Sequence, residues 1–143
     1  MKKHPLLFVV MFLFCNPASS QSYDLITRAN SGDTYAQVML GNMFAAGEGV
    51  VQDYSEAAIW YRLAAYRGVA KAQLSLGLLY SQGQGVDQNL ELAFKWVYMA
   101  AALGEEGAID ARDLVAGQLD AEVLERARQV AVRCLESEYE ECE

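Results

Sequence analysis

The chain has 143 residues, and its 19 acidic against 11 basic side chains give a formal net charge of −8 at pH 7. Hydrophobic residues make up 53 % of it, which excludes a fully disordered chain and leaves enough apolar material for the core of one domain. The acidic balance argues against a nucleic-acid partner, because binding to phosphates requires clustered lysine and arginine. Both prolines, Pro5 and Pro17, lie near the N-terminus, so the rest of the chain favours helices.

Residues 1–20 have the layout of a secretory signal peptide. Lys2 and Lys3 precede the apolar run 6–15, and small polar residues follow as far as Ser20. A helix of this run would reach about 15 Å, half of a hydrocarbon core, so a membrane anchor is the weaker interpretation. We expect cleavage to leave residues 21–143 as a single domain with no membrane span. The mature protein would then be periplasmic or secreted.

A period of 36 residues organises the body of the chain. When residues 33–68 are aligned with residues 69–104, thirteen of the 36 positions are identical. Unrelated sequences of ordinary composition would share roughly two or three. Residues 105–143 match the 36-residue pattern only weakly. The sequence therefore predicts two full repeats of about 33–68 and 69–104, followed by a degraded unit and a cap at 105–143.

Each repeat predicts two helices. In the first repeat they span 34–46 and 54–67, and in the second they span 70–82 and 90–103. Gly41 and Gly77 fall in the middle of the first helices, where glycine costs about 1 kcal/mol against alanine, so we expect close helix–helix approach there. Gly47 and Gly83 follow the first helices and can end them with a positive φ.

These residues resemble a known family. The positions shared by the two repeats read Ala-Gln-x-x-Leu-Gly, then Gly-x-Gly-Val, then Ala-x-x-Trp and Ala-Ala-x-x-Gly, and the whole pattern occurs twice between Ala29 and Ala108. It is similar to the Sel-1-like repeat, a branch of the tetratricopeptide-type solenoids. Asn89 departs from the aspartate found at the equivalent Asp53, which puts the geometry of that loop in question.

The resemblance implies an all-α fold. It would be a short right-handed α-solenoid of antiparallel helix pairs with a role in holding proteins together, and it carries over no catalytic residue, cofactor or metal ligand. Some cysteine-rich bacterial members of the family are linked to the binding or hydrolysis of β-lactams. The alternative function is therefore a cell-wall or β-lactam hydrolase, although neither repeat here contains the paired cysteines of those proteins.

The C-terminal part predicts a capping helix at 121–135, with Asp120 as its N-cap. The acidic residues 136–143 read as a solvated tail. In one continuous helix Cys134 and Cys142 would lie about 12 Å apart, too far for a disulfide. If the helix ends near Leu135, the tail can fold back and join them. The alternatives are two free thiols or pairing with another chain.

Little in the expected mature chain suggests catalysis. Cleavage removes His4, the only histidine, so Ser-His-Asp, Cys-His and histidine-based zinc sites are excluded. No Ser-x-x-Lys motif is present. We therefore predict a protein that is not an enzyme and needs no cofactor.

A protein or peptide partner is expected on the concave side, which the first helix of each repeat lines in solenoids of this type. The predicted contact residues are Tyr35, Met39, Asn42, Lys71, Ser75, Leu78 and Leu114. They form a mixed apolar and polar strip suited to a peptide or helix. An alternative is that several of them simply contact the next unit. Tyr66 and Arg67 are secondary candidates, and self-association through the open N-terminal end is a third hypothesis.

Overall fold

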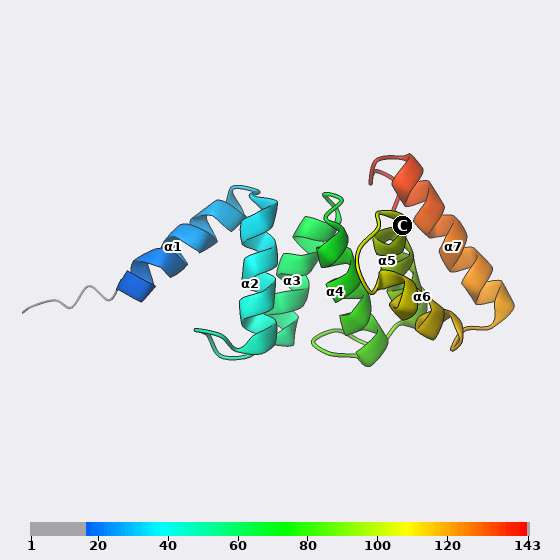
Figure 1. The fold of residues 1–143 in the computed structure, drawn as a ribbon, viewed down its shortest axis with the longest axis horizontal. Helices are drawn as coiled ribbons and strands as arrows, with labels where there is room; N and C mark the ends of the chain where they lie inside the picture. The colour runs from blue at the N-terminus through cyan, green and yellow to red at the C-terminus, as the bar shows by residue number, and fades with distance from the viewer. Residues whose placement is uncertain (1–16, 143) are drawn as a thin grey trace, which may run out of the picture.

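The described part of the chain, residues 17–142 of a computed structural model, contains seven helices and no strand (Figure 1). The helices are α1 (Pro17–Asn30), α2 (Thr34–Ala46), α3 (Tyr54–Ala65), α4 (Ala70–Gln82), α5 (Leu90–Ala102), α6 (Ala108–Ala116) and α7 (Ala121–Glu136). The all-α prediction is confirmed. Residues 1–16 of the predicted signal peptide lie outside the described residues, and residues 17–20 form the first turn of α1.

The helices stack one beside the next as an α-solenoid (Figure 1). Within the repeats α2 pairs with α3 and α4 with α5, while α1 packs on α2 and α3 on α4 to join successive units. The predicted first helices, 34–46 and 70–82, have the observed bounds. The second helices end at Ala65 and Ala102, slightly before the prediction, because the chain turns there toward Gly68 and Gly104, which have positive φ.

The loop between paired helices is the same in both repeats. Gly47 and Gly83 end α2 and α4 with φ of 71° and 66°. The side chains of Asp53 and Asn89 then accept backbone hydrogen bonds at the starts of α3 and α5. The two caps have nearly identical backbone angles, so the replacement of aspartate by asparagine leaves the loop geometry unchanged.

The mid-helix glycines allow close packing, as predicted. A Cβ on Gly41 would lie 2.5 Å from the ring of Tyr61, and one on Gly77 would lie 2.7 Å from Val97. Each glycine thus lets the first helix of a repeat approach the second more closely than alanine would.

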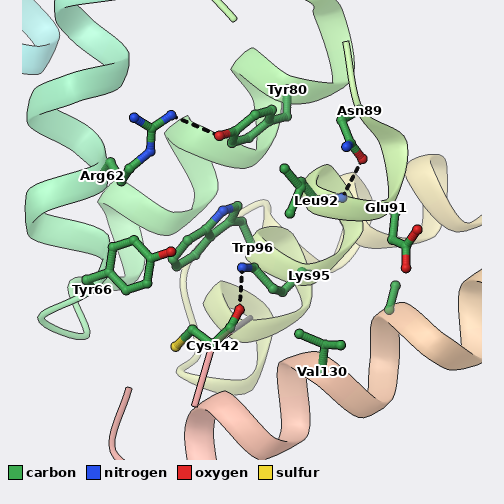
Figure 2. A pocket seen from close by; sticks show the side chains of 11 residues that line it. Arg62, Tyr66, Tyr80, Asn89, Glu91, Leu92, Lys95, Trp96, Val130 and Cys142 are labelled. Carbon is green, nitrogen blue, oxygen red and sulfur yellow. Dashed lines mark hydrogen bonds between the residues drawn. The ribbon is translucent and has the colours of Figure 1, made fainter. Parts of the chain in front are cut away.

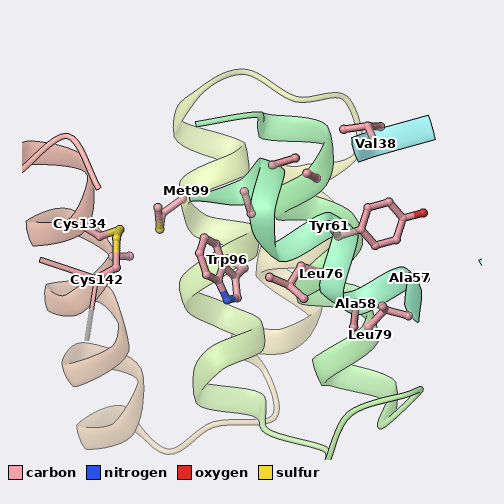
Figure 3. Close-up of a cluster of buried hydrophobic side chains, with 14 residues drawn as sticks. Val38, Ala57, Ala58, Tyr61, Leu76, Leu79, Trp96, Met99, Cys134 and Cys142 are labelled. Atoms are coloured by element: carbon pink, nitrogen blue, oxygen red, sulfur yellow. A yellow bond between two sulfur atoms is a disulfide. The ribbon is translucent and has the colours of Figure 1, made fainter. Parts of the chain in front are cut away.

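Residues 36 apart occupy equivalent places in the core. Trp60 packs against a buried cluster of Leu25, Ala29, Ala36 and Leu40. Trp96 belongs to the largest cluster, together with the equivalent residues one repeat later (Figure 3). Those equivalents are Tyr61, Ala65, Ala72 and Leu76. Small alanines at the helix crossings leave room for the indole in both repeats.

The last two helices depart from the repeat. Helix α6 packs on α5 as α4 packs on α3, but α7 then packs along α5 instead of forming a close pair with α6. Asp120 caps α7 as predicted, with its carboxylate accepting from the Val123 N–H at 2.9 Å. Ala127, Ala131 and Cys134 make up its buried face. Among the described residues, no helix combines the length and hydropathy needed to cross a membrane.

Candidate functional site

The predicted contact strip is only partly gathered by the fold. Tyr35, Met39 and Asn42 of α2 and Lys71 of α4 line one shallow groove between these two helices, with a volume of about 380 Å³. Tyr35 is 66 % exposed, and Met39 is also accessible. The groove therefore presents two apolar side chains beside an amide and an ammonium group.

Two of the predicted residues are tied to a buried tyrosine beneath this groove. The Tyr61 hydroxyl donates to the Asn42 Oδ1 at 2.7 Å, and Ser75 lies within its hydrogen-bonding reach. Burial raises the pKa of Tyr61 above its usual range, against the opposing effect of the bond with Ser75. Tyr61 thus fixes the relative positions of α2 and α4.

The remaining strip residues lie outside the groove. Leu78 is half-buried, and Leu114 on α6 is 69 % exposed. Of the secondary candidates, Arg67 donates to the Gly32 carbonyl at 3.1 Å and so bridges neighbouring units. Tyr66 lines a different cavity, which the sequence did not predict.

This second cavity has a volume of about 520 Å³ and lies between α3, α5 and α7 (Figure 2). Arg62 and Tyr66 come from α3 and the turn after it, Tyr80 from α4, and Trp96 from α5. The other lining residues are Asn89, Glu91, Leu92, Lys95, Ala127, Val130 and Cys142. We call it the α3–α5 cavity.

Aromatic rings and cations meet in the α3–α5 cavity. The rings of Tyr66 and Trp96 stand edge to face, with centroids 5.1 Å apart. Arg62 donates from Nη2 to the Tyr80 hydroxyl at 2.9 Å. Lys95 is only 4 % exposed, and its Nζ donates to the Cys142 carbonyl at 2.8 Å while lying 4.5 Å from the centre of the Trp96 ring.

One carboxylate lies at the edge of the cavity and is already engaged. Glu91 Oε1 accepts from Arg126 Nε of α7 at 2.9 Å. This ion pair, together with apolar contacts such as that between Phe94 and Ala127, fastens α7 to α5.

The C-terminal tail is packed, which corrects the expectation of a solvated tail. Cys142 is buried and forms a disulfide with Cys134, their Cα atoms 4.3 Å apart. Tyr139 packs against Gly68, and its hydroxyl accepts from Gln73 Nε2 at 3.3 Å. The tail glutamates 136, 138, 140 and 141 are exposed, so the prediction of a solvated segment holds for these four side chains but not for Tyr139 and Cys142.

Two features of the sequence are partial signals for the α3–α5 cavity. Lys95 stands inside an apolar helix, at the position that Ile59 occupies in the first repeat, and the spacing of Cys134 and Cys142 permits a folded-back tail. Neither signal shows that the tail would lie against Lys95. Among residues 23–142 no group of three or more histidine, cysteine, aspartate or glutamate side chains could hold a metal ion, and His4 lies outside that range.

Comparison with known proteins finds similarity in sequence and in structure. The model of the family described as Sel1 repeat matches residues 34–69 and 70–105. A crystal structure of a protective antigen present in uropathogenic Escherichia coli strains, displaying an SLR fold, is 30 % identical with a TM-score of 0.75. The match covers 80 % of this chain and 26 % of that one.

A second similar structure is a Sel1 repeat protein from Oxalobacter formigenes. It is 31 % identical with a TM-score of 0.64, and the match covers 69 % of this chain and 41 % of that one. The chain thus spans less than half the length of either structure. No curated protein matches it.

Proposed function

Because the chain belongs to the Sel1 repeat family, whose members generally serve as scaffolds for protein–protein binding, we propose that it is a non-catalytic scaffold for a protein or peptide partner. The partner lies on the concave strip of Tyr35, Met39, Asn42, Lys71, Ser75, Leu78 and Leu114. The observation that carries this proposal is the groove between α2 and α4, where four of these residues meet.

The chemistry of the groove favours a segment with both apolar and polar side chains. Tyr35 and Met39 offer exposed apolar surface, which a partner would remove from water. Lys71 and Asn42 stand beside them and can bond to the partner's backbone or to its acidic side chains. Tyr61 holds both walls in place before binding, which lowers the entropy lost on association.

The site of action in this proposal is the periplasm or the exterior of the cell. A disulfide persists in oxidising compartments, and Cys134 and Cys142 are placed as such a pair. Residues 1–20 act as a cleaved signal peptide, and residues 21–143 form the mature domain, with repeats at 33–68 and 69–104 and a degraded unit and cap at 105–143. N-terminal sequencing of the protein recovered from a periplasmic extract is expected to begin at Gln21, and recovery of uncut protein in the cytoplasm would contradict this.

A photo-crosslinking experiment tests the binding face. Benzoylphenylalanine is placed at Tyr35 in the groove, and in a matched protein at Val51, which is 87 % exposed on the loop between α2 and α3. Crosslinking in the native envelope is expected to give one discrete adduct from position 35 and none from position 51.

Substitution within the groove supplies the second half of this test. Met39→Glu is expected to abolish the adduct from position 35, because it places a charge among the apolar contacts. Val51→Glu should leave the adduct unchanged. Equal crosslinking from positions 35 and 51, or persistence of the adduct in Met39→Glu, would show that the strip is not the binding face. An adduct of twice the chain mass would identify a second copy as the partner.

The hydrolase alternative is tested separately. The purified mature protein is expected to leave nitrocefin and peptidoglycan unchanged. The reason is that its sequence predicts neither a Ser-His-Asp or Cys-His set nor a Ser-x-x-Lys motif for hydrolysis. Turnover that co-purifies with the protein and is lost on its thermal unfolding would contradict the non-catalytic assignment.

A further inference from the structure

The α3–α5 cavity shares no lining residue with the α2–α4 groove, and its chemistry differs as well. Its walls are the faces of α3, α5 and α7 that meet around Trp96 (Figure 2). An inference about this cavity therefore does not depend on the proposed concave binding face.

Arg62 provides the strongest indication of what the cavity binds. It is half-buried, and among the described residues no carboxylate lies within ion-pairing distance of it. Its side-chain hydrogen bond to the neutral Tyr80 hydroxyl uses a single N–H of a guanidinium that has five. In a chain with 19 acidic and 11 basic side chains, a half-buried arginine with no acidic neighbour among residues 17–142 is a ready site for an anion.

The surroundings of Arg62 add to the positive charge. Lys95 brings a second cation to the same cavity, held between the Cys142 carbonyl and the Trp96 ring. Among the described residues that line the cavity, the one carboxylate is that of Glu91, which is bound to Arg126 of α7, so much of its charge is offset there.

The remaining walls are apolar. The rings of Tyr66 and Trp96 lie edge to face, and Leu92 and Val130 complete this side of the cavity. A small, strongly hydrated anion would leave these surfaces without contacts, whereas an aromatic or aliphatic body would cover them.

We infer that the α3–α5 cavity binds a carboxylate carried on an apolar body, with Arg62 contacting the carboxylate and the rings of Tyr66 and Trp96 contacting the apolar part. Arg62 can hold both oxygens of a carboxylate at once, because its parallel N–H groups match their spacing. The carboxylate is either that of a free organic acid or the C-terminus of a peptide with a large apolar last residue. The same chemistry would recognise both.

The two tryptophans allow a direct test by NMR of the full mature protein. Trp96 lines the cavity and Trp60 does not, and they are the only tryptophans of the chain. Titration with 4-phenylbutyrate is expected to shift the indole N–H signal of Trp96 with a Kd of about 1 mM, the affinity of an efficient ligand of this size, and to leave the Trp60 signal in place. The neutral 4-phenylbutyramide should bind at least about tenfold more weakly.

A second titration distinguishes the two sources of the carboxylate. The peptide N-acetyl-glycyl-phenylalanine, with a free C-terminus, is compared with its C-terminal amide. Tighter binding of the free peptide than of 4-phenylbutyrate assigns the cavity to protein C-termini, and the reverse order assigns it to small organic acids. Both orders support the inference provided that each acid binds more tightly than its amide.

Matched arginine variants test the contact itself. Arg62→Met keeps the length of the side chain and removes its charge, so the Kd for 4-phenylbutyrate is expected to rise at least about tenfold. Arg67→Met removes the charge of an exposed arginine five residues further along and should leave the Kd unchanged. Arg62→Lys retains the charge but loses the paired N–H groups, so its Kd should rise by about threefold to fivefold. If Arg62→Met fails to fold, an unchanged Kd in Arg62→Lys would show that Arg62 does not contact the carboxylate.

Four results would overturn the inference. They are equal shifts from acid and amide, equal shifts of the two indole signals, equal binding of inorganic phosphate, and an unchanged Kd in a folded Arg62→Met protein, or in Arg62→Lys if Arg62→Met does not fold.

Discussion

At the scale of single residues, the glycines inside helices show best how sequence dictates contact. Gly41 and Gly77 repeat at the 36-residue period in spite of their poor helix propensity, which predicted a close approach of helices. The structure confirms this: the space that a Cβ would need is filled by Tyr61 in one repeat and by Val97 in the other. Which side chains fill it could not be predicted, because that depends on the rotation of one helix against the other.

Gly77→Ala is expected to destabilise the protein. Its Cβ would lie 2.7 Å from Val97 Cγ1 and 3.1 Å from the Ala93 carbonyl oxygen, and neither a β-branched side chain nor the backbone can move away easily. Overpacking of about 1–3 kcal/mol should exceed the gain of about 1 kcal/mol from helix propensity. Urea unfolding measures the difference.

Gly117→Ala is the matched control for this substitution. Gly117 has a φ of −65°, and a Cβ there would meet its nearest atom at an ordinary 3.6 Å. The free energy of unfolding should stay the same or rise slightly. If Gly77→Ala were as stable as Gly117→Ala, the glycine in α4 would not be required by packing.

A second prediction at this scale concerns acid. Arg128 and Gln129 hydrogen-bond to the Glu125 carboxylate on α7 and lower its pKa from 4.5 to about 2, with Arg128 the larger cause. A lowered pKa means that the stabilisation is complete above pH 4.5 and is lost as the pH falls toward 2. The urea midpoint of the native protein should therefore fall over this range.

The variant Glu125→Gln isolates this contribution. Its midpoint should fall less steeply between pH 4.5 and 2 than that of the native protein, because glutamine does not titrate. Glu106→Gln, at an exposed turn position, should follow the native curve. Identical curves for all three proteins would show that the pair with Arg128 contributes nothing to folding.

At the scale of elements, α7 is the part whose placement the sequence could not provide. Its amphipathic pattern and its cap predicted a helix at 121–135, but an apolar stripe does not indicate which surface it will cover. In the structure α7 and the tail cover Lys95 and Met99 of α5. The equivalent residues of α3, Ile59 and Leu63, are each 46 % exposed. Equivalent positions of the two repeats thus have different surroundings, because α7 and the tail cover these residues of α5 and leave those of α3 exposed. The α3–α5 cavity forms where they cover α5.

The disulfide should stabilise the placement of the tail. Cys134→Ser with Cys142→Ser is expected to lower the free energy of unfolding by roughly 2.5 kcal/mol, the chain-entropy value for so short a loop. Tyr139 and the serine side chain at position 142 should then become accessible, since in the native protein the bond holds the tail against Gly68 and Lys95.

Calorimetry with and without a reductant measures this effect. The native protein should lose stability on reduction, and the double serine variant should be indifferent to the reductant. Mass spectrometry showing two free thiols in the protein as isolated would contradict the pairing of Cys134 with Cys142.

At the scale of the whole molecule, the 36-residue period defined the two repeats, the spacing of apolar residues and glycines within them predicted nearly all of their helix bounds, and the family resemblance supplied the fold class. The prediction succeeded because the tryptophan of each repeat packs against residues at equivalent positions, although Trp60 is only partly buried and Trp96 is fully buried. The α3–α5 cavity escaped prediction because its residues are spread from Arg62 to Cys142 and are brought together by the irregular end of the chain.

Stability should vary along the stack. Helix α1 packs chiefly on α2, through Leu25 and Ala29, whereas α4 and α5 are covered on several sides. Hydrogen–deuterium exchange followed by mass spectrometry is expected to be fastest in α1 and slowest in α4 and α5. Protection of α1 equal to that of α4 would indicate that a further surface, such as a second copy, covers it.

The folded-back tail has a consequence for a molecule under tension. Force applied at Cys142 would bypass the tail residues, because the disulfide passes it directly to Cys134 at the end of α7. The tail's contacts with Gly68 and Lys95 would share the load with the middle of the stack. If the protein tethers a partner that exerts force, we expect the C-terminal half to resist unfolding and α1 to unfold first.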